Sequence, residues 1–143
     1  MSRESKMLAG IMLITVPGVM WGGATLLFHL VQRVPGYVDN PLRQDLWRAG
    51  HAHAGVFLVL SLVMLRYVDE AALPSAWAWV ARLGAPIASI LIPAAFFLSV
   101  VSPGSREASG LIYLVVPGAL ALAAAVLVLG IGLIRAARSS ALP

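Results

Sequence analysis

Hydrophobic residues dominate four long runs of the chain, and short polar segments separate these runs. The runs cover residues 7–32, 47–66, 76–101 and 111–135. A helix needs about 20 predominantly apolar residues to cross the hydrocarbon core of a membrane, and each run reaches about that length. The pattern predicts an all-α integral membrane protein, a bundle of four transmembrane helices that forms a single domain over residues 1–143.

Local signals refine the ends and the shape of these helices. Asp45 is expected to cap the second helix, because an aspartate oxygen can accept hydrogen bonds from the free amides of a first turn. Arg82 lies early in the third run, so we expect the membrane-embedded part of that helix to begin near Leu83. Prolines fall inside the runs, where each removes a backbone donor and bends a helix. They are Pro17, Pro86, Pro93 and Pro117.

The composition excludes the soluble globular classes. Apolar residues make up 60% of the chain and charged residues only 11%, whereas charged residues are about 25% of a typical soluble domain. The chain contains no cysteine, so it has no disulfide, no thiolate metal site and no thioether-linked heme. The formal net charge of +4 is spread over loops and ends, which indicates contact with lipid headgroups and argues against nucleic acid.

The positions of lysine and arginine predict an orientation, because cytoplasmic loops of membrane proteins carry an excess of both. With the N-terminus inside, the cytoplasmic side collects more of these residues than the outer side does. The inner set is Arg3, Lys6, Arg66, Arg82, Arg135 and Arg138, and the outer set is Arg33, Arg43, Arg48 and Arg106. We therefore expect a multi-pass protein of a bacterial inner membrane with both termini in the cytoplasm.

The second run opens with two histidines, His51 and His53, in a stretch that reads Gly-His-Ala-His-Ala-Gly over residues 50–55. Ionisable side chains at membrane depth are costly, so an imidazole there is by default a functional candidate. On an α-helix, residues i and i+2 are separated by roughly 200° around the axis. The pair therefore predicts one ligand in each of two neighbouring pockets, where small neighbours leave room for a flat macrocycle. The alternative is a pair of interfacial histidines that hydrogen-bond to adjacent helices.

The third histidine of the chain, His29, lies near the end of the first run. With four crossings, His29 reaches the same membrane face as His51 and His53, which is the outer face in the expected orientation. A shared cofactor layer would need this arrangement. His29 would then be an axial ligand opposite one of the other two, or it would simply reach the membrane interface.

Three further residues at that face complete the candidate site. Arg48 lies one turn before His51, and Arg106 lies in the loop between the third and fourth runs. A guanidinium pairs bidentately with a carboxylate, so both arginines are candidates to hold heme propionates. The alternative is that they reach lipid headgroups. Trp47 is a candidate to stack beside the same group, or to belong to the aromatic belt of the membrane surface.

The sequence of residues 50–55 resembles the His-x-His helix of the heme–copper oxidase catalytic subunit, especially of cbb3-type oxidases and nitric oxide reductases. The resemblance implies that His51 ligates a high-spin heme and His53 a low-spin heme, from opposite faces of one helix. It also implies that the chain corresponds to one of the family's three four-helix arcs, with Arg106 in the propionate-binding loop, so that a homotrimer rebuilds the ring. The family's copper site has no counterpart here, which leaves heme ligation without oxygen reduction.

The sequence thus predicts a small oligomeric membrane cytochrome b, favoured as a homotrimer, in which His51 of one protomer and His53 of a neighbour ligate heme b. Such a protein would be an oxidoreductase-type heme protein without a full copper site. Its heme would accept electrons from a donor, or it would bind O2 or NO. Two alternatives stay open. His29, His51 and His53 of several protomers would bind copper or zinc, since imidazole suits both metals, or the chain would be a non-catalytic accessory subunit of a respiratory complex.

Overall fold

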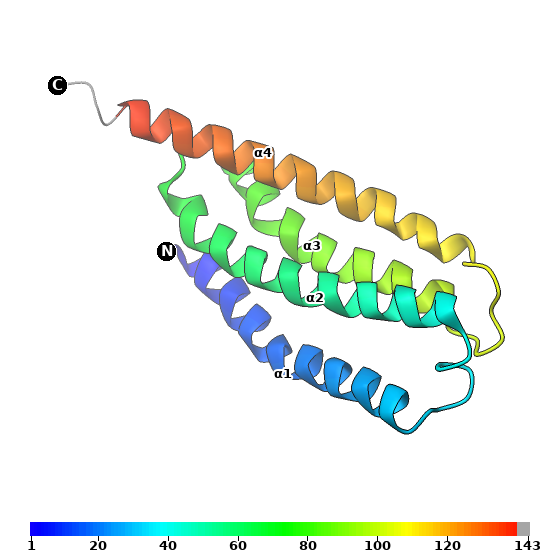
Figure 1. The fold of residues 1–143 in the computed structure, drawn as a ribbon. Helices are drawn as coiled ribbons and strands as arrows, with labels where there is room; N and C mark the ends of the chain where they lie inside the picture. Colours follow the sequence, from blue (N-terminus) through cyan, green and yellow to red (C-terminus); the bar gives the residue numbers. More distant parts are fainter. Residues whose placement is uncertain (140–143) are drawn as a thin grey trace.

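The chain folds into four long helices joined by short connections (Figure 1). The structure is a computed structural model, and it describes residues 1–139. The helices are α1 (Arg3–Val31), α2 (Pro41–Tyr67), α3 (Ser75–Ser99) and α4 (Val115–Ser139), with short 3-10 helices η1 (Val68–Glu70) before α3 and η2 (Gly110–Leu114) before α4. Each long helix is apolar enough to cross a membrane, and no strand occurs within the described residues. The all-α fold of a multi-pass membrane protein is therefore confirmed.

The first two helices begin before their apolar runs, because capping residues set their first turns. Ser2 caps α1, where its hydroxyl accepts a hydrogen bond from a first-turn amide at 3.2 Å. Asn40 caps α2 in the same way, accepting from the Arg43 amide at 3.1 Å, and Pro41 takes the first helical position, which proline favours. The expectation that Asp45 caps α2 is therefore wrong, since Asp45 lies inside the helix.

Proline interrupts two of the helices. Pro17 lies inside α1, and Pro86 and Pro93 lie inside α3. Figure 1 shows that α1 is bent near its middle. Pro117 differs from these three, because it lies in the first turn of α4, where its missing amide has no intrahelical partner to lose. The expectation that Pro117 interrupts a helix is therefore wrong.

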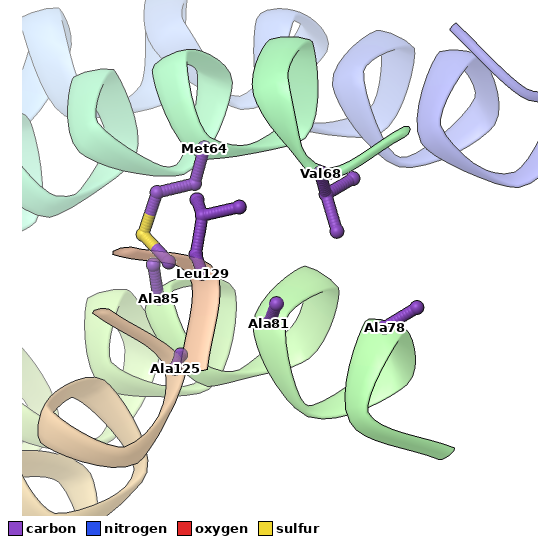
Figure 2. Close-up of a cluster of buried hydrophobic side chains, with 7 residues drawn as sticks. All are labelled: Met64, Val68, Ala78, Ala81, Ala85, Ala125 and Leu129. Carbon is purple, nitrogen blue, oxygen red and sulfur yellow. The ribbon is translucent and has the colours of Figure 1, made fainter. Parts of the chain in front are cut away.

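The helix α3 joins the bundle together. It packs against α2 and against α4, whereas α1 packs against α2 (Figure 1). The approach of α3 to α4 is tight: a Cβ atom added to Gly84 would lie 2.4 Å from the Ala121 carbonyl oxygen. Small residues permit this kind of approach between membrane helices. A buried cluster connects α2, η1, α3 and α4 (Figure 2): Met64, Val68, Ala78, Ala81, Ala85, Ala125 and Leu129.

A hydrogen-bonded network closes one end of the bundle, where α1 begins and α2 ends; we call it the N-terminal end. The Asp69 carboxylate accepts from the Ser2 backbone amide at 2.6 Å and from Nη2 of Arg82 at 2.7 Å. Nε of Arg82 donates to the hydroxyl of Ser5 at 3.1 Å, and Ser5 is fully buried. The network therefore ties α1, η1 and α3 to one another.

The opposite end, where α1 ends and α2 begins, is the histidine end. There the loop of residues 32–40 packs on the loop of residues 100–109. The side-chain amide of Asn40 donates to the carbonyl oxygens of Pro103 at 3.1 Å and Ser105 at 2.8 Å. Asn40 thus caps α2 and joins the two loops at the same time, which fixes the start of α2 relative to the end of α3.

Candidate functional site

All three histidines lie at the histidine end of the bundle. His29 is in the last turn of α1, and His51 and His53 lie in the first half of α2. Because one short loop joins the end of α1 to the start of α2, the three rings occupy the same end of the bundle, as a four-crossing chain predicts. The questions that the sequence leaves open are which way each ring points and what it contacts.

His51 and His53 leave α2 toward different neighbours. The His51 ring lies against the backbone of α1: a Cβ atom added to Gly23 would lie 2.7 Å from its Nε2. The His53 ring lies 5.2 Å from the Phe96 ring of α3 and 5.3 Å from the Phe57 ring, measured between centroids. One histidine therefore faces α1 and the other faces α3, which agrees with the spacing of the pair on a helix.

His51 shares a pocket with Arg48. The pocket has a volume of about 240 Å³, and we call it the His51 pocket. Its lining residues are Gly23, Leu26, Leu27, Leu30, Tyr37, Arg48 and His51. Within residues 1–139, neither the His51 ring nor the Arg48 guanidinium makes a hydrogen bond or an ion pair. The half-buried His51 imidazole and the exposed Arg48 guanidinium therefore both line a largely apolar pocket, and Nε2 of His51 lies on the side of the ring that faces the Gly23 backbone.

Tyr37 connects the His51 pocket to the other side chains of this end. It is only 2% exposed, and its ring lies 5.6 Å from the His29 ring and 5.9 Å from the Trp47 ring. Tyr37 belongs to the loop outside the membrane-spanning helices. Burial raises the pKa of its phenol above the usual value, and the positive charge of Arg48 offsets part of that rise. The phenol therefore remains a neutral hydrogen-bonding group at the edge of the pocket.

Two of the three histidines have a fixed tautomer. Nδ1 of His53 lies 2.7 Å from the Ala49 carbonyl oxygen, and Nδ1 of His29 lies 2.7 Å from the Thr25 carbonyl oxygen. A carbonyl oxygen only accepts hydrogen bonds, so in the neutral ring Nδ1 carries the hydrogen and Nε2 keeps its lone pair. Histidines that ligate metals are oriented in this way, with the second nitrogen donating to a backbone carbonyl or a carboxylate.

His29 lines a different hollow from His51. We call it the His29 groove; it has a volume of about 580 Å³ and is lined by Trp21, Ala24, Thr25, Phe28 and His29. The ring of His29 also contacts Tyr37 and Trp47 edge-on. In a single chain, His29 and His51 therefore do not face a common ligand, although Tyr37 touches the His29 ring and lines the His51 pocket.

The described residues contain no group of three or more histidines, cysteines or acids that is placed to hold a metal ion. All three histidines belong to the described part of the chain. A copper or zinc site built from His29, His51 and His53 would therefore require side chains from more than one copy.

Trp47 and Arg43 hydrogen-bond to the C-terminal end of α3 and to the residues that follow it. Nε1 of Trp47 donates to the Phe97 carbonyl oxygen at 3.2 Å, so the indole is held inside the protein between α2 and α3. The Arg43 guanidinium carbon lies 4.0 Å from the Trp47 ring centroid, a cation–π contact. Nη1 and Nη2 of Arg43 donate to the carbonyl oxygens of Gly36 and Val101 at 3.1 and 3.0 Å, while its buried Nε has no partner among the described residues.

Sequence reasoning singled out Trp47 and assigned Arg43 no role beyond its charge. The signal was present, because Arg43 and Trp47 are spaced i, i+4 on one helix face and Arg43 follows the Asn40–Pro41 start of that helix. Arg106 is exposed, as Arg48 is, but it lies in the loop of residues 100–109 and does not line the His51 pocket. Of the two predicted carboxylate-binding arginines, the structure therefore brings only Arg48 to a histidine.

No protein-family model, curated protein or solved structure matches this chain. The likeness to the heme–copper oxidases thus stays a prediction that rests on the His-x-His motif of residues 50–55.

Proposed function

We propose that the protein is a small membrane cytochrome of the b type, which holds heme b at the His51 pocket. The observation that carries the proposal is that His51 and Arg48 line one apolar pocket without any polar partner in the described chain. A polar group in apolar surroundings costs free energy when it has no partner, and a ligand that hydrogen-bonds or coordinates to it removes that cost. Heme has two matching handles, because iron takes an imidazole nitrogen and a propionate takes a guanidinium.

The other residues of the histidine end fit the same group. His53 keeps an Nε2 lone pair because its Nδ1 is bound to the Ala49 carbonyl, and under the proposal this nitrogen ligates iron on the α3 side of α2, where the ring packs on Phe96. Leu26, Leu27 and Leu30 give the His51 pocket a dry wall. When bound, heme would supply one-electron transfer or a site for a diatomic gas such as O2 or NO.

The heme proposal requires a second copy of the chain, because the pocket of one protomer is small. Pockets that enclose a ligand of this kind have volumes of about 300–1,000 Å³, whereas the His51 pocket has about 240 Å³. One protomer therefore covers only an edge of the macrocycle, and a second copy covers the rest. In this proposal His51 of one protomer and His53 of its neighbour supply the two axial ligands, and a homotrimer closes the ring with each α2 serving two hemes.

The proposal includes a bacterial inner membrane location with both termini in the cytoplasm. This orientation places the N-terminal end, with Arg66, Arg82 and Arg135, on the cytoplasmic side, which the excess of positive charge favours. Enzyme reporters fused to the C-terminus and to the loop of residues 100–109 distinguish the two orientations. Activity of a cytoplasmic reporter at the loop fusion would reverse the assignment.

An optical spectrum of the purified full-length protein tests the heme proposal. Protein from heme-sufficient cells is expected to show a Soret band that disappears in His51→Ala and in His53→Ala. His29→Ala is the matched control and is expected to keep the band, because His29 lines a separate groove.

Other outcomes would contradict the proposal in defined ways. A colourless protein with stoichiometric copper or zinc would favour a metal site shared between copies. A colourless, metal-free protein that assembles equally well in both histidine variants would favour a non-catalytic accessory subunit.

A further inference from the structure

The His29 groove is a second candidate binding site, separate from the His51 pocket. Its five lining residues follow the i, i+3, i+4, i+7, i+8 pattern of one helix face, with Trp21 and Phe28 as walls and Ala24 and Thr25 between them. Its volume of about 580 Å³ falls within the range of small-molecule sites, about 300–1,000 Å³. Trp21 is 76% exposed and Phe28 58% exposed, so the groove opens toward the lipid.

Most polar groups that line the His29 groove are already hydrogen-bonded within α1. The hydroxyl of Thr25 donates to the Trp21 carbonyl oxygen at 2.9 Å, so its hydrogen is already engaged. Nδ1 of His29 is bound to the Thr25 carbonyl at 2.7 Å, which leaves Nε2 with a lone pair in the neutral ring. No described residue donates a hydrogen bond to this nitrogen. The outer end of the groove, at His29, therefore offers an acceptor nitrogen and no free donor among the described residues, while the indole N–H of Trp21 is a free donor two turns deeper.

The position of His29 along α1 adds a constraint on the ligand. His29 lies in the last turn of the helix, near the membrane interface, while Trp21 lies two turns deeper. A matching ligand has a flat apolar body that fits between the aromatic walls and a hydroxyl at its outer end. Molecules of this kind, with one apolar and one polar end, concentrate at the same level of the bilayer as tyrosine and tryptophan.

We infer that the His29 groove binds a lipid-soluble aromatic alcohol, a phenol or hydroquinone, whose hydroxyl donates a hydrogen bond to Nε2 of His29 and whose ring lies between Trp21 and Phe28. The inference does not depend on heme. It predicts a difference in binding between two oxidation states, because a quinone has only carbonyl acceptors where the hydroquinone has hydroxyl donors. Both forms can accept a hydrogen bond from the Trp21 indole N–H, but only the hydroquinone can also donate to Nε2 of His29, so the groove prefers the reduced form.

Direct binding to the full-length protein in phosphatidylcholine nanodiscs tests the inference. Decylubiquinol, decylubiquinone and the monophenol 4-nonylphenol are each equilibrated with protein-containing discs and with empty discs, and the bound ligand is extracted and quantified. The protein-dependent binding of the hydroquinone is expected to exceed that of the quinone by roughly tenfold, the value of one well-placed hydrogen bond. Equal binding of the two forms would overturn the inference.

Variants assign the preference to the groove. His29→Phe keeps a flat ring and removes the lone pair, so binding of the hydroquinone is expected to fall to that of the quinone. Trp21→Ala is expected to weaken both forms, because it removes one wall. The matched control is Trp79→Ala, which alters an apolar groove between α3 and α4 that contains no histidine, and it is expected to leave the binding of both forms unchanged. A redox preference that survives in His29→Phe would overturn the inference.

The two ligand sources and the heme proposal are separable in the same experiment. If the monophenol binds as tightly as the hydroquinone, a single hydroxyl is recognised. If the hydroquinone binds more tightly, the site is specific for hydroquinones. Both results support binding of an aromatic alcohol in the His29 groove. His51→Ala is expected to abolish heme and to leave the preference for the reduced form intact. His29→Phe is expected to do the reverse.

Discussion

The N-terminal end and the histidine end of the bundle treat their polar side chains in opposite ways. At the N-terminal end, the side chains of Arg82 and Asp69 are only 12% and 16% exposed, and each has a further partner at the start of α1, Ser5 for Arg82 and the capping residue Ser2 for Asp69. At the histidine end, His51 and Arg48 line an apolar pocket without any such partner among residues 1–139. Both ion pairs within those residues, Asp69–Arg82 and Arg66–Glu70, lie at the N-terminal end.

The difference separates two kinds of polar residue. Side chains that complete one another inside the protein stabilise the fold, and removing one leaves its partner unsatisfied. A half-buried side chain without a partner, such as His51, costs free energy until something outside the chain binds it. An exposed one without a partner, such as Arg48, is accessible to a ligand. Substitutions at the N-terminal end should therefore change stability, and substitutions at the histidine end should change ligand binding.

Gly84→Ala should cause the largest loss of stability. The added Cβ atom would lie 2.4 Å from a backbone oxygen and from the Ala125 Cβ atom, so α3 and α4 must move apart. Overpacking of this kind costs about 1–3 kcal/mol. The free energy of unfolding in mixed detergent micelles measures the loss. Gly130→Ala is the control, because nothing lies within 4 Å of its added Cβ atom. Equal stability of the two variants would contradict the tight packing of α3 on α4.

Arg82→Gln should reduce the free energy of unfolding by about 1–2 kcal/mol, because the shielded Asp69 carboxylate loses a charged partner. The control is Arg66→Gln. The Arg66–Glu70 pair is 58% and 50% exposed, and exposed pairs contribute about 0–1 kcal/mol. The same unfolding measurement applies. If both substitutions had the same small effect, the hydrogen-bonded network of Asp69 and Arg82 would not stabilise the fold.

Arg48→Gln should leave the free energy of unfolding unchanged, since Arg48 has no partner to lose. Under the heme proposal it should weaken heme retention by roughly tenfold, because the carboxylate loses its guanidinium. Arg106→Gln carries the same change in charge and should have no effect on retention. Transfer of heme to apomyoglobin, followed in the Soret region, measures retention. A loss of stability in Arg48→Gln would contradict the proposed division between the two ends.

Gly23→Ala should have the smallest effect on the fold and a specific effect on the site. The added Cβ atom meets the His51 ring at 2.7–2.9 Å, and a side chain can rotate away where a backbone cannot. We expect a shifted Soret maximum and a few-fold weaker heme retention, with little change in unfolding. Gly18→Ala on the same helix has nothing within 4 Å of its added Cβ atom and should leave the spectrum unchanged.

The sequence was sufficient for the parts of the structure that depend on periodicity. Four apolar runs of membrane-spanning length predicted the four helices, and the i, i+2 spacing predicted that His51 and His53 face different neighbours. Both predictions depend on the local geometry of a helix and on nothing beyond it. Helix ends were less predictable, because the Asn40–Pro41 cap lies outside the apolar run and competes with Asp45 as a start signal.

The grouping of the site residues was not predictable, because it depends on how the helices cross. Arg48 and His51 are close in the chain and share a pocket. Arg106 lies at the same end of the bundle but extends from an exposed loop. His29 lies one short loop away from His51 and still lines a separate groove, since the bend and rotation of α1 decide where its ring points. No pattern in a single sequence encodes that rotation.

The contact of His51 with the Gly22–Gly23 segment of α1 has a mechanical consequence. An imidazole that rests on main chain has no intervening side chain to absorb small displacements. The orientation of the His51 ring therefore depends more on the angle and register between α1 and α2 than on the rotamer preference of the side chain. Any change that slides or tilts α1 over α2, even far from the ring, would turn this nitrogen by a similar amount.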